Sequence, residues 1–563
     1  MIVEVPATDD ATQAVPLTPA ALGFSASEWW PHQRETVGAI LQAFGDGRRV
    51  VILSAPTGSG KTIIAAAVAK LLETRSLTMV HTLALQDQYR RTASWAEIGK
   101  GKSNYPCGFP DTPRRAFVRQ RLGRTPPFNA EDCDEYVGCD NADPDGCDYF
   151  RALGRAAQAD HVIFNYAFAT RITLPAMLRR GIFRGGADIG STDDSDKEGA
   201  AAVLNPFRGD QRPLAILDEG HLANNAIVSA FTLDFWHSTL QGVGLQVPTG
   251  DDLLEWRRWA DGAIRQLRGI ESSDDPIQAR RVDNLRSRLR TLAMINTADW
   301  VVTREARVSH VQPIWARCIY HTAPFLRTYP MILIMSATPG DPSLLAHKLG
   351  FEEGECALVT MPSNFPVENR PVFYWPVVRL SSKSDEADYA TLASAIEFIA
   401  TQPRLAATKG IVHTPSYKLV KQLRECLGSL NGRVLYQESS AVREKMVEAF
   451  AGTDHPWLLV SPSLATGFDL PYAIAYQVIA KTPFADLGDP VVRARREYTL
   501  PDDSRFGKRC YDDDTASAVV QACGRAVRAP DDMGVSYILD ENFIGLYKRA
   551  YFPAYFKDAF HWL

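Results

Sequence analysis

Short runs of apolar residues recur along this chain, and several of them end in small or acidic residues. Three such runs begin at Val50, Leu214 and Met331. Unbroken apolar runs of this kind are typical of parallel strands that helices cover on both faces. From Lys409 onward, five further runs alternate with helical patterns. The pattern therefore predicts an α/β fold with a parallel sheet in each half of the chain.

The stretch between His221 and Met331 has a helical period instead. Apolar residues recur there every three or four positions in two groups: Leu253, Trp256, Ala260, Ile264 and Leu267, then Val282, Leu285, Leu289 and Leu292. Each group lies on one face of a helix. We therefore expect a helical hairpin inserted between two strands.

Length and composition then narrow the class of protein. At 563 residues the chain is too long for one core, so two main domains with insertions are expected. Its 61 basic and 66 acidic residues give a net charge of −5, which excludes a protein that coats nucleic acid by overall positive charge but permits local basic grooves. No apolar run approaches the roughly 18 residues that span a bilayer, so no membrane contact is expected. Residues 1–24 have acidic residues and prolines where a secretory signal would have basic residues and an apolar core, and they are expected to be a disordered lead.

The run at Val50 leads into A-P-T-G-S-G-K-T, residues 55–62, and then into an alanine-rich helix. This order is typical of a P-loop, in which glycines let backbone N–H groups approach phosphates, the lysine adds a positive charge and the threonine hydroxyl ligates Mg²⁺. A chance glycine-rich turn is the alternative, and it is disfavoured because strand, loop and helix follow in the required order. The residues predicted to bind the triphosphate are Gly58, Ser59, Gly60, Lys61 and Thr62.

The run at Leu214 ends in Asp218-Glu219-Gly220-His221. Carboxylates at the carboxyl end of a parallel strand lie at the edge where α/β sheets bind their ligands. We predict that Asp218 holds Mg²⁺ and that Glu219 acts as the base that polarises the attacking water. Alone, this tetrapeptide fits a strand-ending turn equally well, and the P-loop makes the catalytic interpretation the stronger one.

Two arginines near the C-terminal end are candidate arginine fingers. Arg525 and Arg528 stand three positions apart in the segment that begins at Gln521, so they share one face of a helix. From there both could reach a γ-phosphate. A solvated basic face is the alternative, and for an isolated pair it would be the better interpretation.

Four cysteines lie between the P-loop and Asp218: Cys107, Cys133, Cys139 and Cys147. Residues 131–150 contain eight carboxylates and no lysine or histidine, so this stretch is too polar to bury thiols as packing residues. We therefore predict a metal site with four thiolates. Zinc and an iron–sulfur cluster both fit such a set, and spacing does not decide between them.

These motifs resemble superfamily 2 helicases and, among them, the XPD/DinG-like group. The matching segments are W-W-P-H-Q at 29–33, A-P-T-G-S-G-K-T at 55–62, D-E-G-H at 218–221, S-A-T at 336–338, G-F-D-L-P at 467–471, T-P-F at 482–484 and Q-A-C-G-R-A-V-R at 521–528. The likeness runs from about residue 30 to residue 540. One departure is Gly220, where the group usually has alanine, and a glycine would loosen the backbone beside the acidic pair.

The resemblance implies a division of the chain and roles for further residues. Two RecA-like motor domains are expected, with motor domain 1 at 25–100, 151–221 and 322–345, and motor domain 2 at 346–563. A four-cysteine insertion at 101–150 would hold a [4Fe–4S] cluster, with Zn²⁺ as the less favoured alternative, and a helical arch-like insertion is expected at 222–321. By the same resemblance, Gln33 helps to read the nucleotide base, His221 and Ser336 to Thr338 couple hydrolysis to DNA, and motor domain 2 supplies Gly467, Asp469, Gln521, Arg525 and Arg528.

The function expected from these features is an ATP-dependent DNA helicase. It would translocate on single-stranded DNA, 5′→3′ by resemblance, unwind duplex junctions and work as a monomer in the cytoplasm, since a chain with scattered cysteines fits a reducing compartment. The alternative is an ATP-switched protein that binds or remodels nucleic acid without separating strands.

Overall fold

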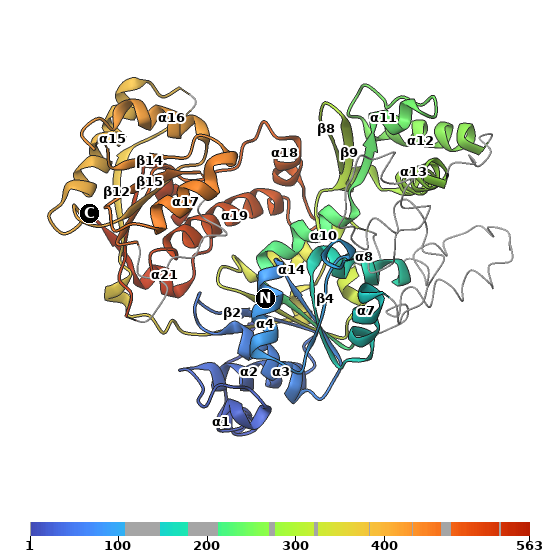
Figure 1. The fold of residues 1–563 in the computed structure, drawn as a ribbon, viewed down its shortest axis with the longest axis horizontal. Helices are drawn as coiled ribbons and strands as arrows, with labels where there is room; N and C mark the ends of the chain where they lie inside the picture. The colour runs from blue at the N-terminus through green and yellow to red at the C-terminus, as the bar shows by residue number, and fades with distance from the viewer. Residues whose placement is uncertain are drawn as a thin grey trace.

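The computed structural model describes residues 2–106, 147–177, 212–268, 276–319, 325–381, 383–430, 432–462, 474–527 and 531–563. Two α/β domains lie next to each other, and a smaller arch-like insertion rises from the first (Figure 1). The prediction of two parallel sheets is confirmed, with eight strands in motor domain 1 and seven in motor domain 2.

The sheet of motor domain 1 is parallel throughout and has the order β1-β11-β2-β10-β6-β3-β5-β4. Its strands are β1 (Val3–Glu4), β2 (Val50–Ser54), β3 (Ser76–Val80), β4 (Glu97–Gly99), β5 (His161–Asn165), β6 (Leu214–Asp218), β10 (Met331–Ser336) and β11 (Cys356–Thr360). The helices around it are α1 (Asp9–Gln13), α2 (Gln33–Gly45), α3 (Lys61–Leu71), α4 (Leu83–Thr92), α7 (Asp148–Gln158), α8 (Tyr166–Met177), α10 (Ala223–Phe231) and α14 (Pro342–Leu349). Every residue of β2 and β6 is buried, as the unbroken apolar runs predict.

Residues 2–24 are ordered, which differs from the expected disordered lead. Val3 pairs with Ala357, so that β1 extends the sheet at its edge. Arg34 donates from Nε and Nη2 to the carbonyl oxygen of Val15, at 3.0 and 2.9 Å. This segment is thus ordered by partners that lie elsewhere in the domain, which its composition alone does not reveal.

The boundary between the motor domains also lies later than residue 345. Strand β11 pairs with β1 and β2, and helix α14 precedes it, so motor domain 1 continues to Thr360. The first strand of motor domain 2 begins only at Val372. The short run at β11 resembles any other strand of this chain, and only its pairing shows which sheet it joins.

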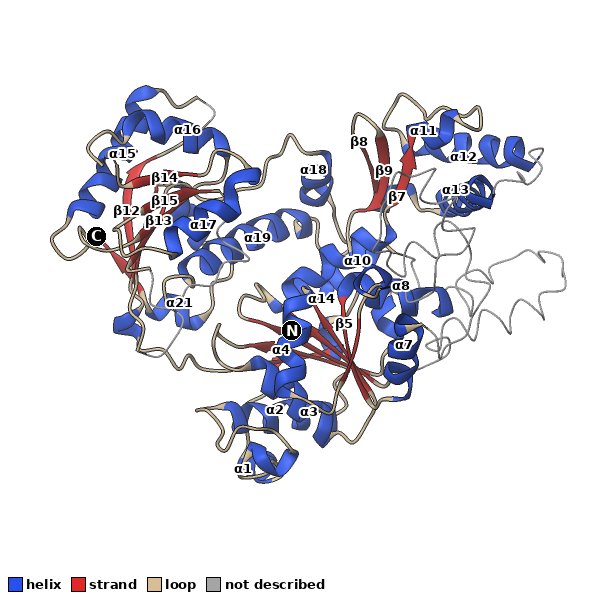
Figure 2. Ribbon diagram, in the orientation of Figure 1, coloured by secondary structure: helices blue, strands red, loops and turns tan. Residues whose placement is uncertain are grey.

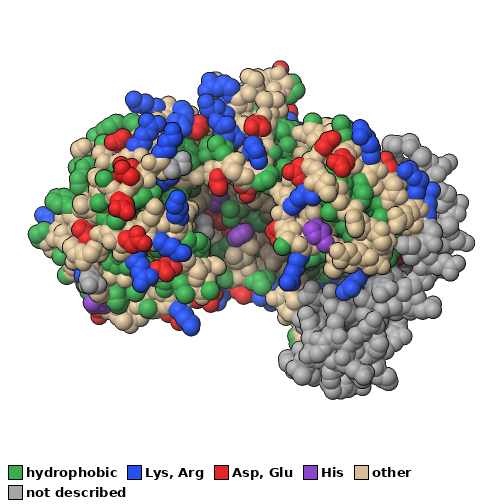
Figure 3. All heavy atoms as spheres, turned by 90° about the horizontal axis from the view of Figure 1, so that it is seen from above, with side chains coloured by type: hydrophobic (Ala, Val, Ile, Leu, Met, Phe, Trp, Pro, Cys, Tyr) green, Lys and Arg blue, Asp and Glu red, His purple; other side chains and the backbone are tan. Residues whose placement is uncertain are grey.

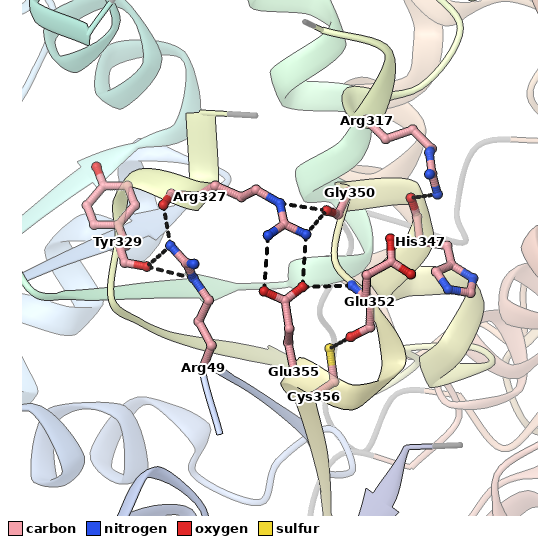
Figure 4. A network of polar contacts seen from close by, with 9 residues as sticks. All are labelled: Arg49, Arg317, Arg327, Tyr329, His347, Gly350, Glu352, Glu355 and Cys356. Atoms are coloured by element: carbon pink, nitrogen blue, oxygen red, sulfur yellow. Dashed lines mark hydrogen bonds and ion pairs between the residues drawn. The ribbon is translucent and has the colours of Figure 1, made fainter. Parts of the chain in front are cut away.

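A polar network holds the amino ends of three strands of motor domain 1 (Figure 4). Arg49, which precedes β2, donates to the carbonyl oxygen of Tyr329 from Nε and Nη2 at 3.2 and 3.0 Å. Arg327 donates to Gly350 O and to Glu355 Oε2, both at 2.8 Å. These contacts lie at the sheet edge opposite the P-loop, and we therefore assign them to stability rather than to the functional site.

The arch-like insertion between β6 and β10 contains the predicted helical hairpin. It also contains an antiparallel sheet of order β7-β9-β8 that the sequence pattern did not predict. Its elements are β7 (Leu233–Trp236), α11 (His237–Gln241), α12 (Leu253–Arg268), α13 (Pro276–Met294), β8 (Trp300–Arg304) and β9 (Val308–Pro313). Trp256 is fully buried where the hairpin packs against the sheet through Phe235. The three strands have only four to six residues each, which is too short for a clear alternating signal.

Motor domain 2 is a second parallel sheet, of order β14-β15-β13-β16-β17-β12-β18 (Figure 2). Its strands are β12 (Val372–Val378), β13 (Gly410–His413), β14 (Val434–Tyr436), β15 (Leu458–Ser461), β16 (Tyr476–Ile479), β17 (Val535–Asp540) and β18 (Phe560–Trp562). Its helices are α15 (Glu386–Thr401), α16 (Tyr417–Cys426), α17 (Arg443–Ala451), α18 (Pro490–Glu497), α19 (Phe506–Cys523), α20 (Asn542–Tyr547) and α21 (Ala554–Asp558). Helix α19 extends from motor domain 2 toward motor domain 1 (Figure 1).

The middle of α19 touches motor domain 1 at a contact that we call the joint. The joint consists of Trp315, Asp341, Leu344, Lys348, Phe506, Asp513 and Asp514. Lys348 Nζ lies 2.6 Å from Asp514 Oδ1 and 3.6 Å from Asp513 Oδ2. Asp513 also accepts a 2.7 Å hydrogen bond from the N–H of Asp341. The joint therefore combines an apolar cluster with a buried lysine that contacts one buried and one exposed carboxylate.

Helix α18 connects motor domain 2 to the base of the arch-like insertion. Tyr498 Oη donates to Asp299 Oδ1 at 2.9 Å, and Arg495 Nε donates to the carbonyl oxygen of Ile314 at 2.9 Å. Arg495 also lies over the ring of Trp315, 5.0 Å from its centroid. The arch-like insertion thus belongs to motor domain 1 by chain connection but contacts both motor domains.

Candidate nucleotide-binding site

The P-loop joins buried strand β2 to helix α3, as predicted. Gly58 and Gly60 have φ of 79° and 77°, a left-handed conformation that glycine adopts without strain. Helix α3 begins at Lys61, whose Nζ lies 3.3 and 3.4 Å from the carbonyl oxygens of Ala55 and Pro56. The lysine therefore curls over the loop, and its charge is directed at the place where the backbone N–H groups of such a loop receive phosphates.

Gln33 packs directly on the P-loop. Its Nε2 donates to the carbonyl oxygen of Ser59 at 3.0 Å, and its Oε1 accepts from the N–H of Trp30 at 3.0 Å. A Cβ on Gly60 would lie 2.2 Å from Gln33 Nε2, so this contact also requires the glycine. The structure thus shows Gln33 as a support of the loop, and its expected role in reading the base stays a prediction.

Sheet register brings the acidic pair to the same edge as the P-loop. Strand β10 lies between β2 and β6, with Ser336 paired to Ser54 and Met335 paired to Asp218. The carboxyl ends of the three strands therefore align, which is the arrangement that parallel α/β sheets use for ligand sites.

Asp218 is a buried carboxylate in an environment that disfavours its charge. Burial and the neighbouring carboxylate of Glu219 raise the pKa of Asp218, whereas Lys61 lowers it. Tyr166 Oη donates to the backbone oxygen of Asp218 at 2.9 Å and holds the end of β6 in place. Such a site gains from a bound cation, and carboxylate and hydroxyl oxygens are the ligands that Mg²⁺ prefers, so Asp218 and Thr62 fit that ion.

Glu219 has a left-handed backbone, with φ 48° and ψ 49°. A residue with a side chain adopts this conformation only where its surroundings impose it, and such residues cluster at functional sites. Its N–H donates to Asp218 Oδ1 at 3.0 Å. The glycine that follows has a packing reason, because a Cβ on Gly220 would lie 2.2 Å from Ile334 Cγ2. The departure from alanine at this position is thus matched by a bulky neighbour in β10.

A chain of hydrogen bonds crosses from the acidic pair to motor domain 2. We call it the nucleotide-side contact, and it consists of Glu219, His221, Ser336, Thr338 and Gln521. His221 Nδ1 lies 2.9 Å from Ser336 Oγ and 3.5 Å from Glu219 Oε2. Gln521 Nε2 lies 2.7 Å from His221 Nε2 and 2.9 Å from Thr338 Oγ1. Residues 300 positions apart in the chain therefore meet beside Glu219.

The nucleotide-side contact requires a neutral His221. Burial lowers the pKa of His221, although the charge of Glu219 opposes this effect. A neutral ring has one donor and one acceptor, so Nε2 accepts from the amide of Gln521 while Nδ1–H donates to Ser336. The imidazole of His221 thus contacts both motor domains, Ser336 through Nδ1 and Gln521 through Nε2. A shift of motor domain 2 would therefore change the orientation or the protonation of this ring.

Tyr555 is a further residue at this edge that the sequence analysis missed. Its Oη donates to the carbonyl oxygen of Ala337 at 2.9 Å. Tyr555 lies in an aromatic tail, residues 547–563, in which Phe552 and Phe556 pack into the core of motor domain 2. No local pattern marks Tyr555, because its partner lies 218 residues away in the chain.

The structure describes part of the remaining predicted site. Arg525 follows the end of α19, where its N–H donates to Ala522 O at 3.1 Å. Burial lowers the pKa of His413 to about 4, and Arg525 contributes to this, which places its charge near the carboxyl end of β13. Cys147 is half-buried and directly precedes α7. The other predicted site residues lie outside the described residues: Cys107, Cys133, Cys139, Gly467, Asp469 and Arg528.

Two features are absent from the described part of the chain. Within the ranges given above, no group of three or more His, Cys, Asp or Glu side chains is placed to hold a metal ion. No helix in the same ranges is long and apolar enough to cross a membrane. Three of the four cysteines of the predicted metal site lie outside those ranges.

Two family models match separate parts of the chain. Residues 26–240 match the family described as type III restriction enzyme, res subunit, and residues 402–559 match the helicase C-terminal domain family. No curated protein matches the chain by sequence. The two matches fall on motor domains 1 and 2, in the order of a two-domain motor.

Solved structures of XPD proteins share the whole fold. The structure of S. tokodaii Xpd4 has a TM-score of 0.55 at 15% identity, with 95% of this chain and 100% of that chain covered. An XPD helicase has a TM-score of 0.57 at 16% identity, with coverage of 95% and 100%. An apo XPD structure has a TM-score of 0.53 at 14% identity, with coverage of 94% and 99%. The chain therefore has two RecA-like motor domains arranged as in these XPD structures, and its resemblance to the XPD-like group is confirmed in the fold.

Proposed function

We propose that this protein is an ATP-dependent DNA helicase that moves along single-stranded DNA. The nucleotide-side contact carries the proposal, because it links the acidic pair of motor domain 1 to Gln521 of motor domain 2. A motor needs an element whose arrangement depends both on the bound nucleotide and on the relative position of its domains. Glu219, His221 and Gln521 form such an element.

The residues of motor domain 1 have distinct roles in this proposal. Backbone N–H groups of the P-loop and Lys61 bind the triphosphate. Thr62 and Asp218 would hold Mg²⁺, which offsets the charge of the phosphate oxygens when it is bound. Glu219 orients the attacking water and accepts its proton. Its constrained backbone fixes the direction of the carboxylate before the nucleotide arrives.

Motor domain 2 would supply positive charge to the same triphosphate. Arg525 and Arg528 act as arginine fingers in this proposal, with Gly467 and Asp469 beside them. The position of Gln521 supports it, because α19 ends two residues after Gln521 and delivers the following turn to the domain interface. Arginine fingers supplied at an interface make hydrolysis depend on domain closure.

Single-stranded DNA is the proposed track. The fold shared with XPD proteins supports a nucleic-acid partner, and the direction of movement, 5′→3′, follows from the resemblance alone. A space-filling view shows a hollow between motor domain 2 and the rest of the molecule, with both Lys or Arg and Asp or Glu side chains around it (Figure 3). The basic side chains there could contact phosphate backbones even though the whole chain is acidic.

We also propose that Cys107, Cys133, Cys139 and Cys147 hold a [4Fe–4S] cluster, with Zn²⁺ as the rival ion. Cys147 supports this in one respect, since it is held at the start of α7 and packs against the core of motor domain 1. A cluster there would attach the insertion to the motor. Elemental analysis of anaerobically purified protein tests the proposal: iron in excess of zinc is expected, with less iron in Cys147→Ser, and zinc alone would contradict it.

The test of the motor is Lys61→Ala. Loss of the lysine charge should reduce ATP hydrolysis on the order of 10²–10³-fold, because the charge acts on the transferred phosphoryl group. Lys70→Ala is the matched control, since Lys70 ends the same helix and lies over Trp95, at 4.8 Å from the ring centroid, instead of reaching the P-loop. Equal activity of Lys61→Ala and the wild type would refute the assignment.

Strand separation distinguishes the two functions that share this motor. A helicase should show ATPase activity that single-stranded DNA stimulates, and it should displace a strand from a duplex with a 5′ single-stranded tail. A remodelling ATPase would hydrolyse ATP without displacing a strand. A 3′-tailed duplex tests the direction, and preferential unwinding of that substrate would overturn the 5′→3′ expectation.

A further inference from the structure

The aromatic segment at the end of motor domain 2, residues 547–563, contains a tyrosine that packs against the core of that domain but directs its hydroxyl out of it. Phe552 and Phe556 are buried in that core, at 1% and 3% exposure. Tyr555 instead directs its hydroxyl to motor domain 1, where it donates to the carbonyl oxygen of Ala337. Arg370 holds the tyrosine from the other side, because it donates to the backbone oxygen of Tyr555 and lies over its ring at 5.9 Å.

Ala337 is the central residue of the S-A-T segment that follows β10. Its two neighbours belong to the nucleotide-side contact, since Ser336 bonds His221 and Thr338 bonds Gln521. Three consecutive residues therefore each have a partner outside the segment, and motor domain 2 supplies two of these partners. The hydroxyl of Tyr555 fixes the peptide that connects the other two contacts.

In the pair formed by Tyr555 and Ala337, the hydroxyl is a donor that keeps its proton and the carbonyl oxygen is a buried acceptor. Ala337 is only 7% exposed, and a buried carbonyl oxygen without a donor is costly. Burial raises the pKa of Tyr555, and the nearby carboxylate of Glu219 adds to this effect. The phenol therefore keeps its proton at any working pH, and it approaches the catalytic edge without adding charge.

We propose that Tyr555 is a positioning residue for the S-A-T segment, and that its hydroxyl sets the geometry in which His221 and Gln521 meet. This inference rests on the proposed ATPase. According to this inference, helix α21, which contains Tyr555, takes part in coupling the two motor domains. When motor domain 2 moves, Tyr555 and Gln521 move with it, and both pull on adjacent residues of motor domain 1.

Tyr555→Phe removes the hydroxyl and keeps the ring. We expect the DNA-stimulated kcat for ATP hydrolysis to fall about fivefold to tenfold, the range of one lost hydrogen bond. The KM for ATP should stay within about twofold, because the P-loop is unchanged. Tyr547→Phe is the matched control: it removes a hydroxyl from the same aromatic segment, where the ring stacks on Phe560 at 4.4 Å. A wild-type kcat in Tyr555→Phe would overturn the inference, as would an equal loss in both variants.

Amide hydrogen exchange gives a second measurement that does not depend on activity. A peptide covering residues 331–341 should exchange faster in Tyr555→Phe than in the wild type, whereas Tyr547→Phe should not change it. Unchanged exchange in that peptide would contradict the positioning role. If the wild type hydrolyses no ATP, the proposed function fails by itself, and the exchange experiment still decides whether Tyr555 holds the segment.

Discussion

The two motor domains touch at the joint and at the nucleotide-side contact, and these two regions consist of different types of interaction. The joint buries Trp315, Leu344 and Phe506 around an ion pair whose lysine is 8% exposed and whose inner carboxylate is 4% exposed. In the nucleotide-side contact, by contrast, the bonds that reach motor domain 2 are two neutral hydrogen bonds from the half-buried Gln521 to His221 and Thr338.

Because their interactions differ, we expect the two regions to have different roles. A buried apolar cluster with a paired charge is expensive to separate, so the joint should persist while the domains move. Neutral hydrogen bonds at an interface exchange for water at a small net change in free energy, so the nucleotide-side contact should open and close. We infer that the joint acts as a pivot and that the other contact responds to the nucleotide.

The largest expected effect on stability comes from Lys348→Met. Removal of the lysine leaves Asp514 and the ionised form of Asp513 without their counter-charge, which should lower the free energy of unfolding by about 2 kcal/mol at pH 8, where Asp513 is mostly ionised. Arg509→Ala is the control, because Arg509 pairs with Asp503 and Asp341 at an exposed position and should change stability by about 0–1 kcal/mol. Urea unfolding measures both, and equal effects would show that the joint is no stronger than a surface contact.

A smaller effect should appear in the pH dependence of stability. Burial raises the pKa of Asp513 from 3.8 to about 7, with Asp514 and Asp341 adding to this and Lys348 opposing it. Between these values the folded state holds a proton that the unfolded state has released, so the contribution to stability is full below 3.8 and is lost as pH rises through about 7. Lys348, whose own pKa is raised, stays charged throughout this range.

Asp513→Asn should remove this titration. Its stability should vary less between pH 5 and pH 7 than that of the wild type, whose slope from this group is at most about 1.4 kcal/mol per pH unit. Thermal or urea unfolding at several pH values is the measurement. Parallel curves for the two proteins would mean that Asp513 does not titrate in this window.

A small change in stability is expected for Gln521→Ala. Two neutral hydrogen bonds disappear at an interface that water can enter, so the free energy of unfolding should fall by about 1 kcal/mol. ATP hydrolysis should fall much more, since the link between Glu219 and motor domain 2 is cut. A stability loss as large as that of Lys348→Met, with activity retained, would reverse the roles assigned to the two contacts.

What the sequence could predict depended on distance along the chain. The P-loop and the Asp218–Glu219 pair were recognisable because each is a local strand-end pattern, and sheet pairing then placed them at one edge. The left-handed backbone of Glu219 and the fit of Gly220 against Ile334 depend on three-dimensional packing and have no local signal.

The contacts between the domains were harder to foresee. Lys348 and Asp514 are 166 positions apart, and neither stands in a recognisable motif. Gln521 was found only because a resemblance pointed to its segment, and Tyr555 was hidden among the aromatic residues of a core-forming tail. Charged and aromatic residues can be picked out of the sequence as candidates for contacts between the domains. Which residue each of them contacts depends on the fold, and the contact determines its role.

Helix α19 connects the two contacts as a single lever. Its 18 residues make it about 27 Å long, and some eight residues, or about 12 Å, separate the pivot at Asp513 from the arm that ends at Gln521. A tilt of about 5° around such a pivot displaces that tip by about 1 Å, which is enough to break a hydrogen bond. A rotation of α19 by a few degrees would then be enough to open or close the nucleotide-side contact. The rigidity of this one helix would determine how far a small rotation at the joint displaces Gln521.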